Sequence, residues 1–201
     1  MTRLGIFGGT FDPPHIAHLI LAAEAHNQLS LDRLLWVLTP APPHKHDRQI
    51  TSLEDRLPML QSAINDNPDF ELSRVDIERQ PPHYALDTVR SIRQKYPQAE
   101  LFYLMGGDSL RDLHTWHKAE EFVSACDYLG VMRRPEDEVV LSAVKEKFSG
   151  IQEKLCFINA PLLEISATDI RKRISEGRPY RYFLLPQVYK FIQENNLYRS
   201  P

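Results

Sequence analysis

The chain has 201 residues, of which 42% are hydrophobic and 25% are charged, and its formal net charge is −3 at pH 7. This composition predicts one domain over residues 1–201 and argues against a nucleic-acid polymer as a partner. No apolar run reaches the ~20 residues that span a bilayer, and we expect no leader segment, which predicts a cytoplasmic protein without a membrane partner. Cys126 and Cys156 lack metal-ligand spacing and are expected to be buried thiols.

The first expected elements are a buried strand at residues 4–7, a tight turn at Gly8 and Gly9, and a helix that opens near Pro14 or His15, with Asp12 or a neighbour as its cap. His15 and His18 would share one face of the first turn, beside backbone N–H groups and the positive end of the helix dipole. This arrangement suits a polyphosphate. A plain turn with a solvated helix end, or half of a metal site, stays open as an alternative.

Apolar strands then alternate with helices along the chain. Strands are expected at residues 34–38, 70–77, 101–105, 128–132 and 154–158, and helices at 53–64, 85–96, 138–148, 166–176 and 184–198, with Thr51 or Ser52 capping the second helix. Continuous apolar strands favour a parallel sheet. We therefore predict an α/β, Rossmann-like, doubly wound and mostly parallel sheet with helices on both faces, and a helical C-terminal part from about residue 165.

Several polar residues follow the expected strands, at the sheet edge where such folds bind ligands. Lys45 lies in the Pro-rich loop at 39–50 and is either a phosphate ligand or an exposed lysine. Asp108 either caps a helix or binds a ribose or a magnesium-bound water. Trp116 is either core or a stacking platform, and Arg133 is either a nucleotide ligand or a surface residue.

A second candidate phosphate site begins at Ser166, which with Asp169 forms a capping-box-like helix start. That start could present amides, hydroxyls and Arg171 to phosphates, or be structural only. The P-loop, the GxGxxG fingerprint and the GxSxG elbow are all missing from the sequence. Any phosphate binding must therefore use a different arrangement of residues.

Two segments carry a family resemblance. GGTFDPPHIAH at residues 8–18 resembles the GGxFxPxHxGH signature of the nucleotidyltransferase superfamily, and ISATDIR at 165–171 resembles its ISxTxxR motif. PPHK at 42–45, the stretch at 82–88, GGDS at 106–109 with Trp116, and Arg133 extend the resemblance to the bacterial nicotinate mononucleotide adenylyltransferases. The sequence departs from these enzymes at Ala17, Ala85 and His117, where they commonly have Gly, Thr and Tyr.

The resemblance implies an enzyme that transfers the adenylyl group of ATP to nicotinate mononucleotide, releasing pyrophosphate and forming nicotinate adenine dinucleotide for NAD biosynthesis. Alternatives are the same transfer to nicotinamide mononucleotide or another phosphomonoester such as phosphopantetheine, cytidylyl transfer to an alcohol phosphate, and a non-catalytic ATP-binding sensor. Mg²⁺ is expected to arrive with ATP, without a metal site in the protein. A homo-oligomer is left open.

The same resemblance assigns residues to each substrate. The implied catalytic residues are His15, His18, Lys45 and Arg171. The implied ATP-binding residues are Gly8, Gly9, Thr10, Phe11, His15, His18, Gly106, Asp108, Arg133, Ile165, Ser166, Thr168 and Arg171. The implied nicotinate mononucleotide-binding residues are Lys45, Tyr84, Ala85, Trp116 and His117, with the carboxylate received by backbone N–H groups near Ala85 and His117 and the pyridine ring stacked on Trp116.

Overall fold

The computed structural model describes residues 1–41, 50–132, 137–161 and 163–199. Six strands form one sheet in the order β3-β2-β1-β4-β5-β6, and all neighbouring strands are parallel. Their bounds are β1 (Arg3–Gly9), β2 (Arg33–Leu38), β3 (Phe70–Ser73), β4 (Glu100–Gly106), β5 (Tyr128–Met132) and β6 (Leu155–Ile158). The doubly wound parallel sheet predicted from the sequence is confirmed.

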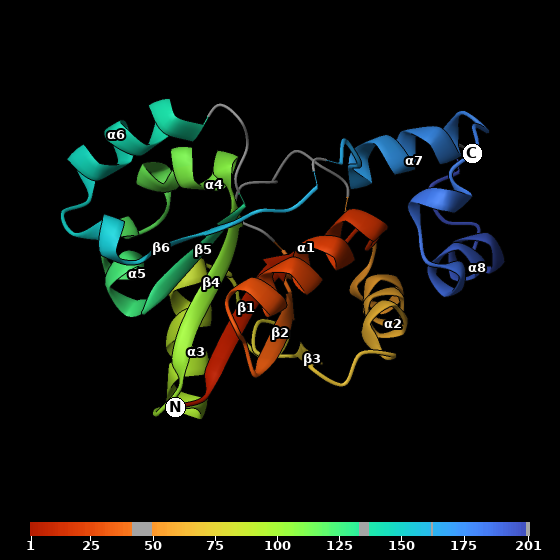
Figure 1. Cartoon of the computed structure of the whole chain (residues 1–201). Helices are drawn as coiled ribbons and strands as arrows, with labels where there is room; N and C mark the ends of the chain where they lie inside the picture. Colours follow the sequence, from red (N-terminus) through yellow and green to blue (C-terminus); the bar gives the residue numbers. More distant parts are fainter. Residues whose placement is uncertain (42–49, 133–136, 162, 200–201) are drawn as a thin grey trace.

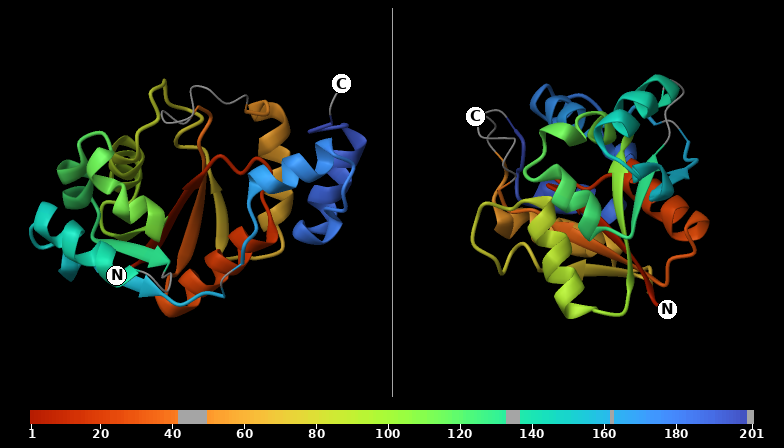
Figure 2. Two further views of the ribbon diagram at one scale, coloured as in Figure 1. Left: turned by 90° about the horizontal axis from the view of Figure 1, so that it is seen from above. Right: turned by 90° about the vertical axis from the view of Figure 1, so that its left-hand side faces the viewer.

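Helices cover both faces of this sheet because its strands are apolar on both sides. On β2, Trp36 packs with one face's core, and Leu35 and Val37 pack with the other. The first core contains residues of α1 (Ile16–Gln28), α2 (Leu53–Ile64), α7 (Ala167–Ser175) and α8 (Pro186–Glu194). The second contains residues of α3 (Ala85–Lys95), α4 (Gly107–Arg111), α5 (Ala119–Ala125) and α6 (Asp137–Lys147). Figures 1 and 2 show these two groups on opposite sides of the sheet.

The strand order reverses between β1 and β4, which are neighbours in the sheet. The chain leaves β1 through α1 on one face, and it enters β4 from α3 on the other face. Connections that diverge in this way open a crevice at the carboxyl ends of the two strands, where doubly wound sheets bind ligands. In Figure 1 the segments that follow β1 and β4 lie at the upper end of the sheet.

Some expected boundaries differ from the structure. The strand predicted at 70–77 ends at Ser73, because the next residues form a turn in which the N–H of Glu78 donates to the carbonyl of Arg74 at 3.0 Å. The C-terminal helix ends at Glu194, four residues before Tyr198. Cys126 is buried as expected, but Cys156, on the edge strand β6, is only half-buried.

The predicted opening of the first helix near His15 is confirmed: the helix begins at Ile16 with His15 as its N-cap, so the cap is a neighbour of Asp12 and not Asp12 itself, and the Asp12–Pro13 peptide bond is cis. The cap expected at Asp108 is wrong. Gly106 rather than Asp108 precedes α4. The caps at Ser52 and Ser166 are confirmed, since each hydroxyl accepts the N–H of the residue three positions later. Within the described ranges, no helix is long and apolar enough to cross a membrane.

Candidate active site

The turn after β1 is shaped by Gly9 and Phe11. A side chain at Gly9 would place its Cβ 2.9 Å from Cζ of Phe11, so glycine is what allows that ring to lie against the backbone. Phe11 has a φ of 46°, in the left-handed region that non-glycine residues rarely adopt. Its ring packs edge-on against Phe7, at 5.6 Å between centroids, and against His18, at 5.1 Å. The turn therefore fixes one edge of the His18 imidazole.

His15 and His18 form a stacked pair at the start of α1. Their ring centroids are 3.6 Å apart, and the backbone N–H of His15 donates to Nδ1 of His18 at 3.2 Å. A neutral His18 that accepts at Nδ1 carries its hydrogen on Nε2, so the ring presents a donor on its other side. Burial lowers the pKa of His15, which is 5% exposed, to about 4. His15 is thus an uncharged imidazole at neutral pH.

The N-terminus of α7 faces this pair across a cavity of about 480 Å³. Ser166 caps α7, and the guanidinium of Arg171 donates from Nη1 to the carbonyl oxygen of Asp12 at 2.6 Å. We call this space the histidine cavity. Its lining includes these residues of the two sequence motifs: Gly9, Thr10, Phe11, Asp12, His15, Ala17, His18, Ile165, Ser166, Thr168 and Arg171.

A buried arginine holds the strand ends that border the site. Arg56 on α2 is 2% exposed and donates to four backbone carbonyls, those of Thr10, Thr39, Pro40 and Thr51, at 2.8 to 3.0 Å. Because Thr10 follows β1 and Thr39 follows β2, this one side chain fixes the carboxyl ends of both strands relative to α2. Hydrogen bonds from a charged donor are stronger than neutral ones.

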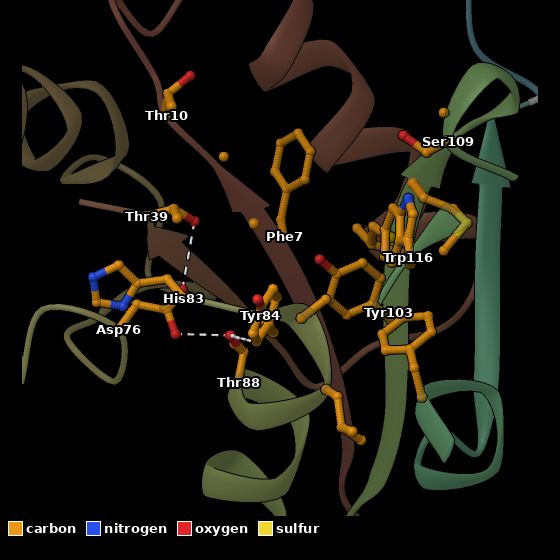
Figure 3. A pocket seen from close by; sticks show the side chains of 18 of the residues that line it. Phe7, Thr10, Thr39, Asp76, His83, Tyr84, Thr88, Tyr103, Ser109 and Trp116 are labelled. Atoms are coloured by element: carbon orange, nitrogen blue, oxygen red, sulfur yellow. Dashed lines mark hydrogen bonds between the residues drawn. The ribbon is translucent and has the colours of Figure 1, made fainter. Parts of the chain in front are cut away.

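A second cavity of about 320 Å³ lies beyond Gly9 and Thr10, which line both spaces. We call it the aromatic cavity, since rings form much of its wall (Figure 3). Trp116 packs on Phe122 at 5.1 Å between centroids and meets Tyr103 edge-on at 6.1 Å. At the same cavity, Tyr84 and His117 stack at 4.0 Å. Such a wall suits a flat aromatic ligand.

The opposite wall of the aromatic cavity is polar (Figure 3). Asp76 is 2% exposed and accepts from the hydroxyl of Thr88 at 2.7 Å and from Arg79 at 3.0 Å. His83 lies beside it, and burial, outweighing the raising effect of Asp76, lowers the pKa of this imidazole. Ala85 begins α3 and also lines the cavity, so the first N–H groups of a helix, which have no partner within the helix, lie at this wall.

Most of the predicted site residues that the structure describes line one of the two cavities. Tyr84, Ala85, Trp116 and His117 line the aromatic cavity together with Gly8 and Gly106. Asp108 lines neither cavity: its side chain is half-exposed and pairs with Arg111 at 3.4 Å. Lys45 and Arg133 lie outside the described residues, so their predicted contacts stay predictions.

Several residues at the site were not expected from the sequence. Asp76 and His83 in the aromatic cavity, and Arg56, which donates to the carbonyl of Thr10, were not singled out. A carboxylate at the carboxyl end of a strand is the signal that could have identified Asp76, because such strand ends border the ligand crevice. Arg56 sits within an amphipathic helix, and the sequence holds no signal of its burial.

The chain is similar in sequence to known proteins. The family model for cytidylyltransferase-like proteins matches residues 6–173. Over 200 residues the chain is 43% identical to the "probable nicotinate-nucleotide adenylyltransferase" of Thermomicrobium roseum, covering 100% of this chain and 93% of that protein. It is 38% identical to the nicotinate-nucleotide adenylyltransferase of Bacillus subtilis, with 100% of both chains covered.

A solved structure shares the fold. The nicotinic acid mononucleotide adenylyltransferase of Plasmodium falciparum complexed with NaAD superposes with a TM-score of 0.78, at 21% identity, over 98% of each chain. At this identity the likeness concerns the fold.

Proposed function

Because the chain belongs to the nicotinate-nucleotide adenylyltransferases, within the cytidylyltransferase-like family, we propose that its two adjoining cavities hold the two substrates of that reaction. The enzyme transfers the adenylyl group of ATP to nicotinate mononucleotide, forms nicotinate adenine dinucleotide and releases pyrophosphate, a step of NAD biosynthesis. The observation that carries the assignment is that Gly9 and Thr10 line both cavities, so two ligands would meet at the end of β1.

The histidine cavity takes the triphosphate of ATP in this proposal. Arg171 supplies a fixed positive charge, and His18 supplies an imidazole N–H from Nε2, on the side opposite the backbone hydrogen bond at Nδ1. The hydroxyls of Ser166 and Thr168 and the N–H groups at the start of α7 add further donors. Donors held in place before the reaction stabilise charge that develops on the leaving pyrophosphate.

The aromatic cavity takes nicotinate mononucleotide. Trp116 stacks on the pyridine ring, and the N–H groups that open α3 near Ala85 receive the nicotinate carboxylate. The acceptor phosphate then points toward Gly9 and Thr10, where the α-phosphate of ATP arrives from the other cavity. In this proposal backbone N–H groups bind the carboxylate. The side chains at positions 85 and 117 can therefore differ from the Thr and Tyr that are common in these enzymes.

Catalysis in this proposal is positioning with charge stabilisation. The nucleophile is an oxygen of the acceptor phosphate, which is already anionic and needs no general base. It forms a bond to the α-phosphorus of ATP, while the bond from that phosphorus to the bridging oxygen breaks and pyrophosphate leaves with the electron pair. His15 and His18 therefore do not transfer a proton and act through hydrogen bonds.

Mg²⁺ accompanies ATP as part of the substrate. Mg²⁺ binds phosphate oxygens and keeps several waters, and it seldom needs a protein cage. Among the residues that the structure describes, no three His, Cys, Asp or Glu side chains are grouped so that they could hold a metal ion. In the histidine cavity the lining carboxylate is Asp12, which is buried and already accepts hydrogen bonds.

The assignment of the cavities is tested by comparing Arg171→Ala with Trp116→Ala. We expect Arg171→Ala to raise the KM of ATP and Trp116→Ala to raise the KM of nicotinate mononucleotide, each by about tenfold or more and with little change in the other KM. Steady-state assays of pyrophosphate release measure both constants. If each variant raised both KM values equally, the two cavities would not be separate substrate sites.

A further inference from the structure

Tyr198 links the C-terminus of the chain to the histidine cavity. It lies four residues beyond the end of α8 and is half-buried, and its hydroxyl donates to Oδ1 of Asp12 at 2.7 Å, across 186 positions of sequence. Burial, and then the charge of Asp12, raise the pKa of this phenol above its usual range, so Tyr198 keeps its proton and acts as the donor. Its φ of 65° lies in the left-handed region that non-glycine residues rarely adopt.

Asp12 is the point at which three segments of the chain meet. Its side chain is 4% exposed, and Oδ2 accepts the N–H of Thr51 at 3.3 Å while Oδ1 accepts from Tyr198. Its backbone carbonyl accepts from Nη1 of Arg171 at 2.6 Å. The residue before Ser52 at the start of α2, the helix α7 and the tail after α8 are therefore all bonded to one residue of the turn after β1, and this residue lines the histidine cavity.

The carboxylate of Asp12 also lies close to the charge that ATP needs. Oδ2 is 4.0 Å from Nη1 of Arg171, which is too long for a hydrogen bond and close enough for ionic attraction. A buried carboxylate satisfies its oxygens with whatever donors it can reach. Without the hydroxyl of Tyr198, Oδ1 of Asp12 loses a donor, and the nearby guanidinium of Arg171 can approach the carboxylate more closely. A close Asp12–Arg171 pair would compete with the triphosphate.

We propose that Tyr198 is a positioning residue for ATP: by holding Oδ1 of Asp12 it keeps that carboxylate from pairing closely with Arg171. The inference rests on the proposed role of Arg171 at the triphosphate. It concerns ATP alone, since neither Asp12 nor Arg171 lines the aromatic cavity. The C-terminal tail thereby contributes to substrate binding at a site built mainly from the opposite end of the chain.

The test is Tyr198→Phe, with Tyr189→Phe as the matched control. Tyr189 is also a half-buried tyrosine, on α8, and its hydroxyl accepts from Gln193 at 2.8 Å, away from both cavities. We expect Tyr198→Phe to raise the KM of ATP by about tenfold, the effect of one hydrogen bond to a charged group. The KM of nicotinate mononucleotide should stay within about twofold in both variants.

A second variant separates this role from a structural one. Asp12→Asn removes the charge that would attract Arg171, so on that background Tyr198→Phe should change the KM of ATP by less than about twofold. The inference is overturned if Tyr198→Phe behaves as Tyr189→Phe, if it raises both KM values equally, or if its effect persists on the Asp12→Asn background. If Arg171→Ala itself leaves the KM of ATP unchanged, the proposed function of Arg171 fails instead.

Discussion

The buried imidazole of His15 predicts a specific dependence of stability on pH. Burial lowers its pKa from 6.5 to about 4 in the folded protein, while the unfolded chain keeps the ordinary value. Between these two values the unfolded state binds a proton that the folded state does not. The free energy of unfolding therefore loses a contribution as pH falls from about 6.5 towards 4, and the full difference corresponds to about 3 kcal/mol.

Urea denaturation of the native protein and of His15→Asn, followed by circular dichroism at pH 7.5 and 4.5, isolates this contribution. Asparagine does not titrate, so the variant lacks the proton uptake of residue 15 on unfolding. Other groups, such as His83, titrate in both proteins and cancel in the comparison. We expect the native protein to lose about 2 to 3 kcal/mol more than the variant over this range.

Equal losses in the two proteins would contradict this prediction, because they would mean that residue 15 titrates alike in the folded and unfolded states. A larger loss in His15→Asn would show that His15 gains a proton on folding. In the first case burial would not shift the pKa of His15, and in the second the folded site would stabilise its charged form.

Three further substitutions test the roles of His18, Arg56 and His117. His18→Ala should lower kcat by about 100-fold while the melting temperature changes little, because it removes one preorganised donor, and an unchanged kcat would contradict that role. Arg56→Met should lower the free energy of unfolding by about 3 kcal/mol or more in urea titration, since four backbone carbonyls lose the donor that a buried side chain gives them. A loss below about 1 kcal/mol would contradict the role of Arg56 in holding the strand ends. His117→Phe keeps an aromatic ring against Tyr84. If backbone N–H groups recognise the carboxylate, the ratio of kcat/KM for nicotinate mononucleotide to kcat/KM for nicotinamide mononucleotide should stay within about threefold of the native ratio. A much lower ratio would assign recognition of the carboxylate to the imidazole.

Local patterns predicted the layout of the fold because they are set by neighbouring residues. Apolar runs such as residues 34–38 are buried on both faces of a parallel sheet, and the cap at Ser166 depends only on the next three residues. Where contacts between distant residues determine the structure, the local sequence pattern gave a wrong prediction. The strand from Phe70 ends early, as the chain turns and places Asp76 against Thr88 of α3.

The two sequence motifs could be recognised because each combines a helix start with side chains three positions apart, such as His15 and His18. The residues that hold these motifs in place could not be identified from the sequence. Arg56 reaches carbonyls 5 to 46 positions away, and Tyr198 reaches Asp12 across 186 positions. Neither contact leaves a periodic or compositional trace, and Asp12 read alone suggested a helix cap.

Pyrophosphate release with ATP and three acceptors measures which substrate the aromatic cavity takes: nicotinate mononucleotide, nicotinamide mononucleotide or phosphopantetheine. We expect kcat/KM for nicotinate mononucleotide to exceed that for either other acceptor by about tenfold or more, because helix N–H groups at the aromatic cavity favour an anionic ring substituent. Equal or higher turnover with nicotinamide mononucleotide or phosphopantetheine would contradict it.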